Sequence, residues 1–194
     1  MQISPILSGL AVLTFVPALA LAGAGQPSRP TAEEGAAMAM TVSSPAFRAG
    51  AAVPVRHTCD GEDVSPRLEW TDPPAGTRAF ALIVDDPDAP VGDWVHWVVV
   101  DIPATARALP EGIARADRIP GLEPARQGRN DFGRLGWGGP CPPPGKAHRY
   151  FFKLYALGGP LGLAAGATKA EVEKRIAGRT LAKAEMYGTY ARGR

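Results

Sequence analysis

The chain has 194 residues, of which 45% are hydrophobic, and its 21 Lys and Arg against 19 Asp and Glu give a net charge of +2. This length predicts one domain with a sizeable core, and the balanced charge argues against a nucleic-acid-binding surface. Glycine (23 residues) and proline (20 residues) are too frequent for a helical bundle and favour a β protein rich in turns.

The first 24 residues predict a signal peptide. Residues 3–22 are almost wholly apolar, and the small residues at their end fit two small-x-small cleavage patterns. The length also suits a membrane anchor, which is the competing interpretation. After cleavage, a flexible leader at residues 25–39 would precede a single domain at residues 40–194. We therefore expect an exported protein, either periplasmic or secreted.

Export makes the two cysteines informative, because an oxidising compartment favours disulfides. Cys59 and Cys141 both lie in turn-rich loops, so a bridge would tie an early loop to a late one. In the chain-entropy model, closing a loop of about 80 residues contributes roughly 4 kcal/mol to stability. Two free, buried thiols are the alternative.

The first half of the domain is typical of short strands separated by turns. Residues 40–47, 53–57 and 67–70 predict three short strands. Residues 78–85 predict a longer strand that ends at a loop rich in Asp and Pro, two residues that do not extend a β-ladder. Residues 94–102 have the strongest strand pattern, and their apolar residues at both parities predict a central strand buried on both faces.

The second half begins with a rigid loop and ends with predicted helices. Residues 130–147 are rich in Gly and Pro and lead into an aromatic strand at 148–155. Thr168 and Glu171 fit a helix capping box, and residues 180–187 predict a second short helix. These elements together predict a mainly β fold, a two-sheet antiparallel, Greek-key-like sandwich with short C-terminal helices.

Polar residues at two strand ends predict a pocket for an anion, and the candidates are Asp86, Asp88, His96, His148 and Tyr150. His148 and Tyr150 share a face because side chains alternate along a strand. If the two histidines converge, imidazole donors, the phenol and the N–H groups of a Gly-Gly-Pro loop would bind an anion, while Asp86 orients an imidazole. Each residue also has a plainer interpretation: His96 and Tyr150 as core residues, and the two aspartates as turn formers.

Two pairs of motifs, taken together, resemble the phosphatidylethanolamine-binding protein family, and more closely its bacterial Raf-kinase-inhibitor-like branch. One pair is DPDAP at residues 86–90 with WVHW at 94–97, and the other is GPCPP at 139–143 with HRY at 148–150. The likeness extends over nearly the whole mature chain, from about residue 40 to residue 192.

The resemblance implies a two-sheet β-sandwich with a small pocket for phosphate, acetate or a phospholipid head group. It also implies a cis peptide at Ala89–Pro90. Trp137 and Arg67 depart from the family pattern, and Trp137 would alter the pocket rim. By match of motif, seven residues would line the pocket: Asp86, Asp88, His96, Gly139, Pro140, His148 and Tyr150.

The leading hypothesis is non-catalytic binding of an anionic or phosphorylated small group, without a cofactor, a metal or nucleic acid. The alternative is inhibition of a protein partner, a kinase or protease, through the pocket rim around Trp94, Trp137 and residues 142–144. A hydrolase with His96 or His148 as the base is the least favoured, because no Ser stands in a nucleophile-elbow pattern. Edge strands would provide a route to a homodimer.

Overall fold

The computed structural model describes residues 39–193. The expected signal peptide, and all but the last residue of the expected leader, lie outside this range. Within residues 39–193 there are eight strands, one α-helix and one short 3-10 helix. None of the helices in that range is long and apolar enough to cross a membrane.

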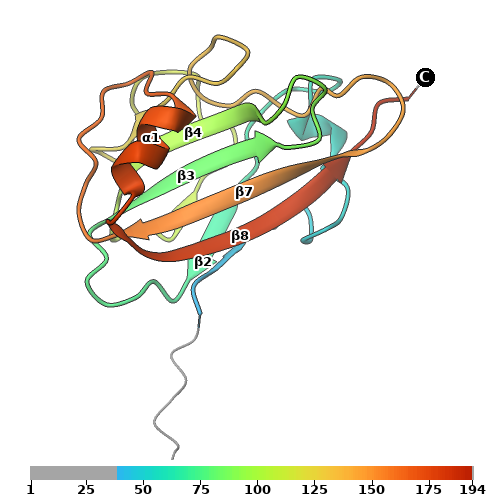
Figure 1. Ribbon diagram of the computed structural model, residues 1–194. Helices are drawn as coiled ribbons and strands as arrows, with labels where there is room; N and C mark the ends of the chain where they lie inside the picture. The colour runs from blue at the N-terminus through green and yellow to red at the C-terminus, as the bar shows by residue number, and fades with distance from the viewer. Residues whose placement is uncertain (1–38, 194) are drawn as a thin grey trace, which may run out of the picture. The chain divides into compact units, whose positions relative to one another are not determined.

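Two antiparallel sheets build the domain, which confirms the predicted two-sheet sandwich (Figure 1). The smaller sheet has the order β1 (Thr41–Ser43), β2 (Leu68–Thr71), β5 (Ala108–Leu109). The larger sheet has the order β6 (Arg126–Gln127), β4 (Trp94–Pro103), β3 (Ala79–Asp86), β7 (His148–Leu157), β8 (Thr180–Tyr190).

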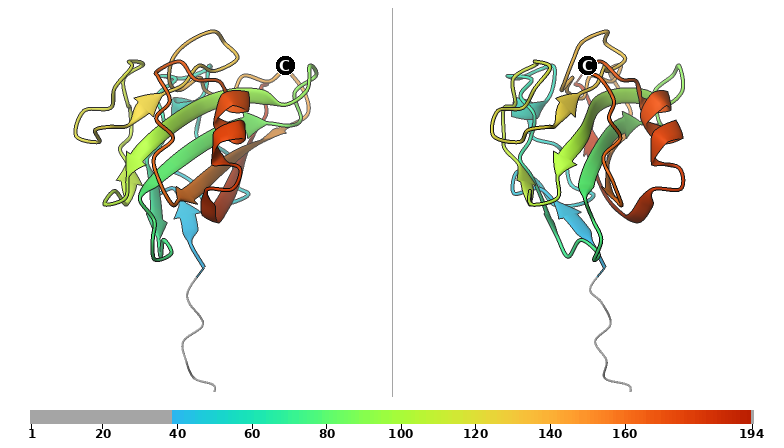
Figure 2. Two further views of the ribbon diagram at one scale, coloured as in Figure 1. Left: turned by 60° about the vertical axis from the view of Figure 1, so that its left-hand side comes forward. Right: turned by 90° about the vertical axis from the view of Figure 1, so that its left-hand side faces the viewer.

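Strand β3 divides the apolar residues of the domain between two cores. Phe80, Leu82 and Val84 pack with residues of the smaller sheet, whereas Ala81 and Ile83 pack on the other side with helix α1. Figure 2 shows the resulting layers, with α1 on one side of the larger sheet and the smaller sheet on the other. All eight residues of β3 are buried, and β4 is buried along its length except at its two ends, as its apolar pattern predicted.

Helix α1 (Lys169–Ile176) begins at the predicted capping box. The Thr168 hydroxyl accepts a hydrogen bond from the Glu171 N–H, and the Glu171 carboxylate accepts one from the Thr168 N–H at 2.8 Å. These bonds satisfy N–H groups that have no partner inside the helix. Val172 and Ile176 then cover the outer face of the larger sheet.

The second predicted helix is wrong, because residues 180–190 form strand β8. Ala, Leu, Lys and Glu favour helix by local propensity. However, Ala184, Met186 and Gly188 are buried at every second position, which is the period of a strand. Pairing with β7 along almost its whole length overrides the local preference.

Two local predictions near turns are also wrong. Residues 53–57, predicted to be a strand, contain the 3-10 helix η1 (Val55–His57), which follows Pro54. Among the described residues the cis peptide bond is Glu123–Pro124 rather than Ala89–Pro90. The two isomers of an X–Pro bond differ by only about 0.5–1 kcal/mol, so the sequence alone does not decide between them.

Candidate functional site

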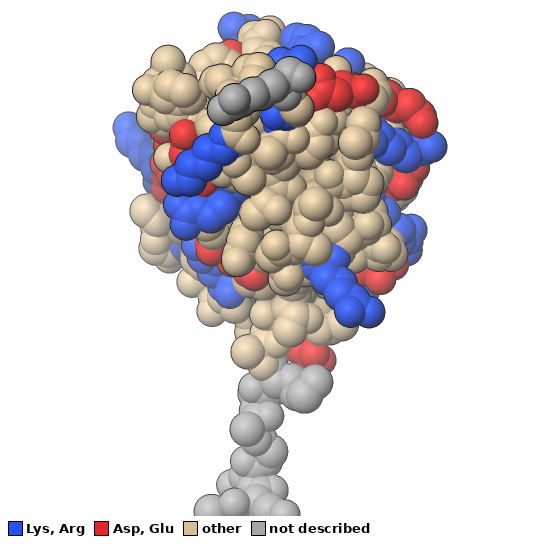
Figure 3. All heavy atoms as spheres, turned by 90° about the vertical axis from the view of Figure 1, so that its right-hand side faces the viewer, with Lys and Arg blue, Asp and Glu red and all other residues tan. Residues whose placement is uncertain are grey.

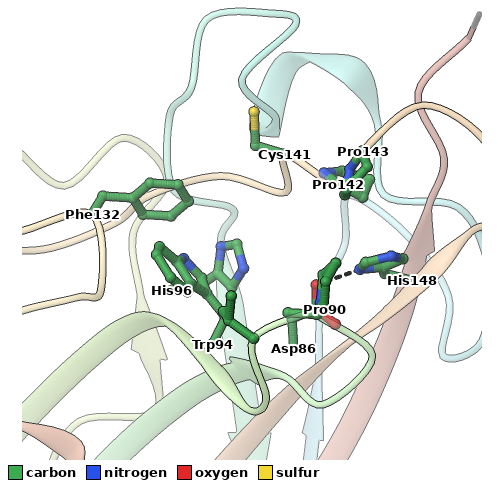
Figure 4. A pocket seen from close by; sticks show the side chains of 11 residues that line it. Asp86, Pro90, Trp94, His96, Phe132, Cys141, Pro142, Pro143 and His148 are labelled. Carbon is green, nitrogen blue, oxygen red and sulfur yellow. Dashed lines mark hydrogen bonds and ion pairs between the residues drawn. The ribbon is translucent and has the colours of Figure 1, made fainter.

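A cavity of about 190 Å³ opens at the end of the sandwich where β3 ends and where β4 and β7 begin (Figure 4). Its polar lining comes from three of the predicted site residues, Asp86, His96 and His148. The rest of the lining is mostly apolar: Ala89, Pro90, Val91, Trp94, Phe132, Cys141, Pro142 and Pro143. The two histidines that the sequence predicted to converge therefore border the same cavity.

Asp86 and His148 form a buried pair on one wall of the cavity. Asp86 is the last residue of β3 and follows the parity of Phe80, Leu82 and Val84, so it faces the sandwich interior. The His148 Nδ1–H donates to Asp86 Oδ2 at 2.8 Å, and the Asp88 N–H donates to Asp86 Oδ1 at 2.8 Å. This pairing fixes the tautomer of His148 and leaves Nε2 as the ring nitrogen available to a guest.

His96 reaches the cavity because β4 carries a bulge at this point. Val84 pairs with Trp97 and Asp85 pairs with Val95, so His96 is an extra residue in the ladder. A bulge of this kind turns a side chain out of the regular alternation. The His96 Nδ1–H donates to the Gly138 carbonyl at 2.6 Å, and the Gly138 N–H donates to the His96 carbonyl at 2.9 Å.

The electrostatic environment of His96 favours the neutral imidazole. The ring is buried, and burial lowers its pKa below the usual 6.5, although the Gly138 carbonyl and Asp86 act in the opposite direction. The ring is held edge-on between two aromatic side chains, Tyr150 at 5.0 Å and Phe132 at 5.4 Å between ring centroids. At neutral pH, His96 therefore presents Nε2 as a hydrogen-bond acceptor.

Tyr150 lies behind His96 and does not border the cavity. Its side chain is fully buried, and its hydroxyl has no hydrogen-bond partner within residues 39–193. Burial raises the pKa of Tyr150, and so does the nearby Asp86 carboxylate, although the two groups do not have the geometry of a hydrogen bond. Tyr150 therefore stays a neutral phenol that supports the imidazole.

Gly139 and Pro140, also predicted to line the cavity, are not among its lining residues. The Gly139 N–H donates to Asp63 Oδ1 at 2.6 Å, and the Pro140 carbonyl accepts from the Cys59 N–H at 3.1 Å. Because the Gly138 N–H is also bonded, the expected cluster of free backbone donors is already used within the protein. Gly139 is required by packing, since a Cβ there would lie 2.5 Å from the His57 carbonyl oxygen.

The predicted disulfide is confirmed. It joins the loop after η1 to the Gly- and Pro-rich loop before β7. Cys59 and Cys141 are bonded, with 5.4 Å between their Cα atoms. Cys141 also borders the cavity. The bridge therefore attaches one cavity wall to the loop that follows η1.

Asp88 points away from the cavity and anchors the start of β7. Its carboxylate accepts two hydrogen bonds from the Arg149 guanidinium at 2.8 Å and one from the Arg149 N–H at 2.9 Å. The Arg149 hydrogen bonds lower the pKa of Asp88 to about 2. Because Arg149 follows His148 directly, this pairing holds His148 in place without contact between Asp88 and the cavity.

The apolar rim is the part of the site that sequence reasoning only partly found. Trp94 and Pro142 to Pro143 border the cavity, as the inhibitor hypothesis assumed. Trp137 does not lie on the rim. It is buried against Trp97 and Phe152, at 5.7 and 6.1 Å between ring centroids. Phe132 was missed, because nothing in the surrounding Gly-rich segment indicates that its ring folds back toward His96.

Among the described residues, the cavity lining provides an acid–base pair but no side-chain nucleophile. Asp86 and His148 form an acid–base pair, but the described lining contains no Ser or Thr, and Cys141 is in the disulfide. Within residues 39–193, no group of three or more His, Cys, Asp and Glu is arranged to hold a metal ion.

Comparison with known proteins places the chain in a family. The family model described as phosphatidylethanolamine-binding protein matches residues 43–191. A relative from Aquifex aeolicus, called a UPF0098 protein, is 49% identical over 155 residues, which is 79% of this chain and 89% of that protein. The chain belongs to the phosphatidylethanolamine-binding protein family, as its paired motifs indicated.

Solved structures agree with this assignment. The crystal structure of Escherichia coli YbcL, described as a member of the mammalian family of these proteins, is 38% identical with a TM-score of 0.74. A homolog from Chlamydia trachomatis, described as a putative phosphatidylethanolamine-binding protein, is 37% identical with a TM-score of 0.72. Each alignment covers 79% of this chain and 98% of the solved chain.

Proposed function

We propose that the protein binds a small anionic or phosphorylated group, such as phosphate or a phospholipid head group, without catalysing a reaction. The main support is that His96 and His148 border one cavity, each with Nδ1 bonded to the protein and Nε2 left for a guest. The Asp86 carboxylate orients the His148 ring by accepting from Nδ1–H, so Nε2 is the ring atom that an anion can contact.

The size of the cavity favours a small guest. Pockets for drug-sized ligands measure about 300–1,000 Å³, whereas this cavity measures about 190 Å³. It is large enough for a phosphate-sized group, with any longer part of the molecule lying across the apolar rim. The family name agrees with a head group as one such guest.

The pocket end of the molecule also has a largely uncharged face, on which an apolar portion of a guest could lie. Figure 3 views this end, and uncharged atoms cover the middle of the face while Lys, Arg, Asp and Glu lie around its margin. Val91, at the rim, is 77% exposed. The same observation supports the second candidate function, inhibition of a protein partner that contacts the rim.

We also propose that binding takes place after export. The apolar segment at residues 3–22 supports this location. The Cys59–Cys141 disulfide supports it as well, because disulfides persist in oxidising compartments.

Phosphate or phosphoethanolamine is expected to raise the melting temperature of the protein. At a ligand concentration of about 100 Kd, binding stabilises the fold by roughly 2.7 kcal/mol, which corresponds to about 5–10 °C for a domain of this size. The variant His148→Asn should lose this rise, because its amide can still donate to Asp86 but has no atom in the place of Nε2. Differential scanning fluorimetry measures both proteins.

The matched control is His57→Asn. His57 is also buried, and its Nδ1–H donates to the Val64 carbonyl at 3.0 Å, but it does not border the cavity. This variant should keep the full ligand-induced rise. If millimolar phosphate and phosphoethanolamine leave the wild-type melting temperature unchanged, anion binding is not the function. Capture of a protein partner that survives His148→Asn would then favour the inhibitor candidate.

A further inference from the structure

The hydrogen bonds inside the site decide which atoms of a guest it can satisfy. Both imidazoles that border the cavity use their Nδ1–H groups within the protein, His96 toward the Gly138 carbonyl and His148 toward Asp86. The Gly138 and Gly139 N–H groups are bonded as well. The cavity therefore offers fewer donors to a guest than a count of its polar residues suggests.

The remaining polar atoms on the cavity are mainly acceptors. The Asp86 carboxylate is acceptor-only when ionised, and His96 Nε2 is an acceptor in the neutral ring. His148 Nε2 becomes a donor when the ring is protonated beside Asp86. A guest that only accepts hydrogen bonds would leave His96 Nε2 facing another lone pair, whichever form His148 takes.

Charged groups around the two imidazoles do not change this pattern. Asp86 and Asp85 act on His96 from β3, and Tyr150 and Phe132 pack against its ring, but burial dominates and lowers its pKa. His148 contacts Asp86, and the neighbouring carboxylate of Asp88 is neutralised by Arg149. The Nδ1–H bond to Gly138 and the burial of the ring therefore make His96 Nε2 an acceptor at neutral pH.

We propose that the pocket selects anions that bring a hydrogen-bond donor of their own and discriminates against anions that carry none, such as sulfate. This inference rests on the proposed function and specifies the class of guest. A hydrogen phosphate would donate its P–OH to His96 Nε2, while its other oxygens lie near His148 Nε2, which is a donor only in the protonated ring. The ammonium of an ethanolamine head group is the corresponding donor in a phosphodiester, whose phosphate has no hydrogen.

Phosphate and sulfate provide a direct test, because they are tetrahedral anions of similar size that differ at neutral pH by one hydrogen. Isothermal titration of the wild-type protein at about pH 7.5 should show phosphate binding at least about 10-fold more tightly, the effect of one unsatisfied buried acceptor. At a lower pH, below the usual histidine pKa of about 6.5, protonation of His96, whose pKa is lowered by burial, should make the ratio fall.

Two variants test whether His96 causes the preference for phosphate over sulfate. His96→Asn can still donate to the Gly138 carbonyl but lacks Nε2, so its phosphate-to-sulfate ratio should approach one at both pH values. His57→Asn should keep the wild-type ratio. Should His96→Asn fail to fold, the wild-type ratio and its change with pH test the proposal without it.

A second pair of ligands distinguishes a lipid head group from free phosphate. Glycerophosphoethanolamine carries N–H donors, whereas glycerophosphocholine has a quaternary ammonium without any. Preference for the first indicates that the site accepts the head-group donor, and binding of neither together with tight phosphate binding indicates that the guest is free phosphate or a phosphomonoester.

Two results would overturn the inference in distinguishable ways. Equal binding of phosphate and sulfate by the wild-type protein at about pH 7.5 would contradict donor selection and leave anion binding intact. Failure of every anion to bind at either pH would reject the proposed function together with the inference.

Discussion

Replacing both Cys59 and Cys141 with Ser is expected to lower the free energy of unfolding by about 4–5 kcal/mol. The bridge spans 82 residues of sequence, so its removal releases a long loop in the unfolded chain. Both cysteines are exposed, and the substitutions therefore remove little packing. Equilibrium unfolding in urea, with linear extrapolation to water, measures the difference.

The wild-type protein in its reduced form is the matched control for the cysteine variant. Its free energy of unfolding should equal that of the double Ser variant, because both lack the cross-link and little else differs. A double variant within about 1 kcal/mol of the oxidised wild-type protein, far below the chain-entropy value, would contradict a stabilising role for the bridge.

The second large effect is expected at Asp85, a fully buried carboxylate on the face of β3 opposite Asp86. The Lys153 ammonium lies 2.7 Å from Oδ1 and donates to Oδ2, and Lys169 donates to Oδ2 at 2.7 Å. Asp85 Oδ1 therefore contacts the charge of Lys153 but accepts no hydrogen bond of good geometry. Burial opposes the charged form of Lys169, but Asp85 and Asp93 together raise its pKa.

Asp85→Ala is therefore expected to destabilise the fold by about 3–5 kcal/mol, because it leaves two largely buried ammonium groups without their shared partner. Urea unfolding measures this loss. Asp93→Ala is the control, since it removes an exposed partner of Lys169 and should cost less than about 1 kcal/mol. A loss at Asp85 no larger than the loss at Asp93 would show that the buried cluster contributes little.

The longer strands of the larger sheet could be predicted because their apolar patterns are strong. Residues 78–85 and 94–102 agree with β3 and β4 to within one residue at each end. Strand β8 could not be predicted in the same way. Its buried residues Ala184, Met186 and Gly188 alternate with residues of good helix propensity, so the strand period is hard to recognise in the sequence. Its pairing with β7 is a long-range interaction that the local sequence does not show.

The candidate site could be located from the sequence, but its hydrogen bonding could not be derived. Alternation placed His148 and Tyr150 on one face of their strand, and loops rich in Asp and Pro marked the strand ends where the candidate residues gather. The bulge at His96 depends on how β3 and β4 pair, and no residue pattern in the sequence indicates it. No residue pattern indicates the hydrogen bond from the Gly139 N–H to Asp63 Oδ1 either, because the two residues are far apart in the sequence.

A crystal structure grown in phosphate tests most directly whether Asp86, His96 and His148 enclose an anion site. We predict tetrahedral density in the cavity, within hydrogen-bond distance of Nε2 of both imidazoles, and loss of that density in His148→Asn crystals from the same solution. An empty cavity at saturating phosphate, or an anion bound elsewhere on the domain, would contradict the account.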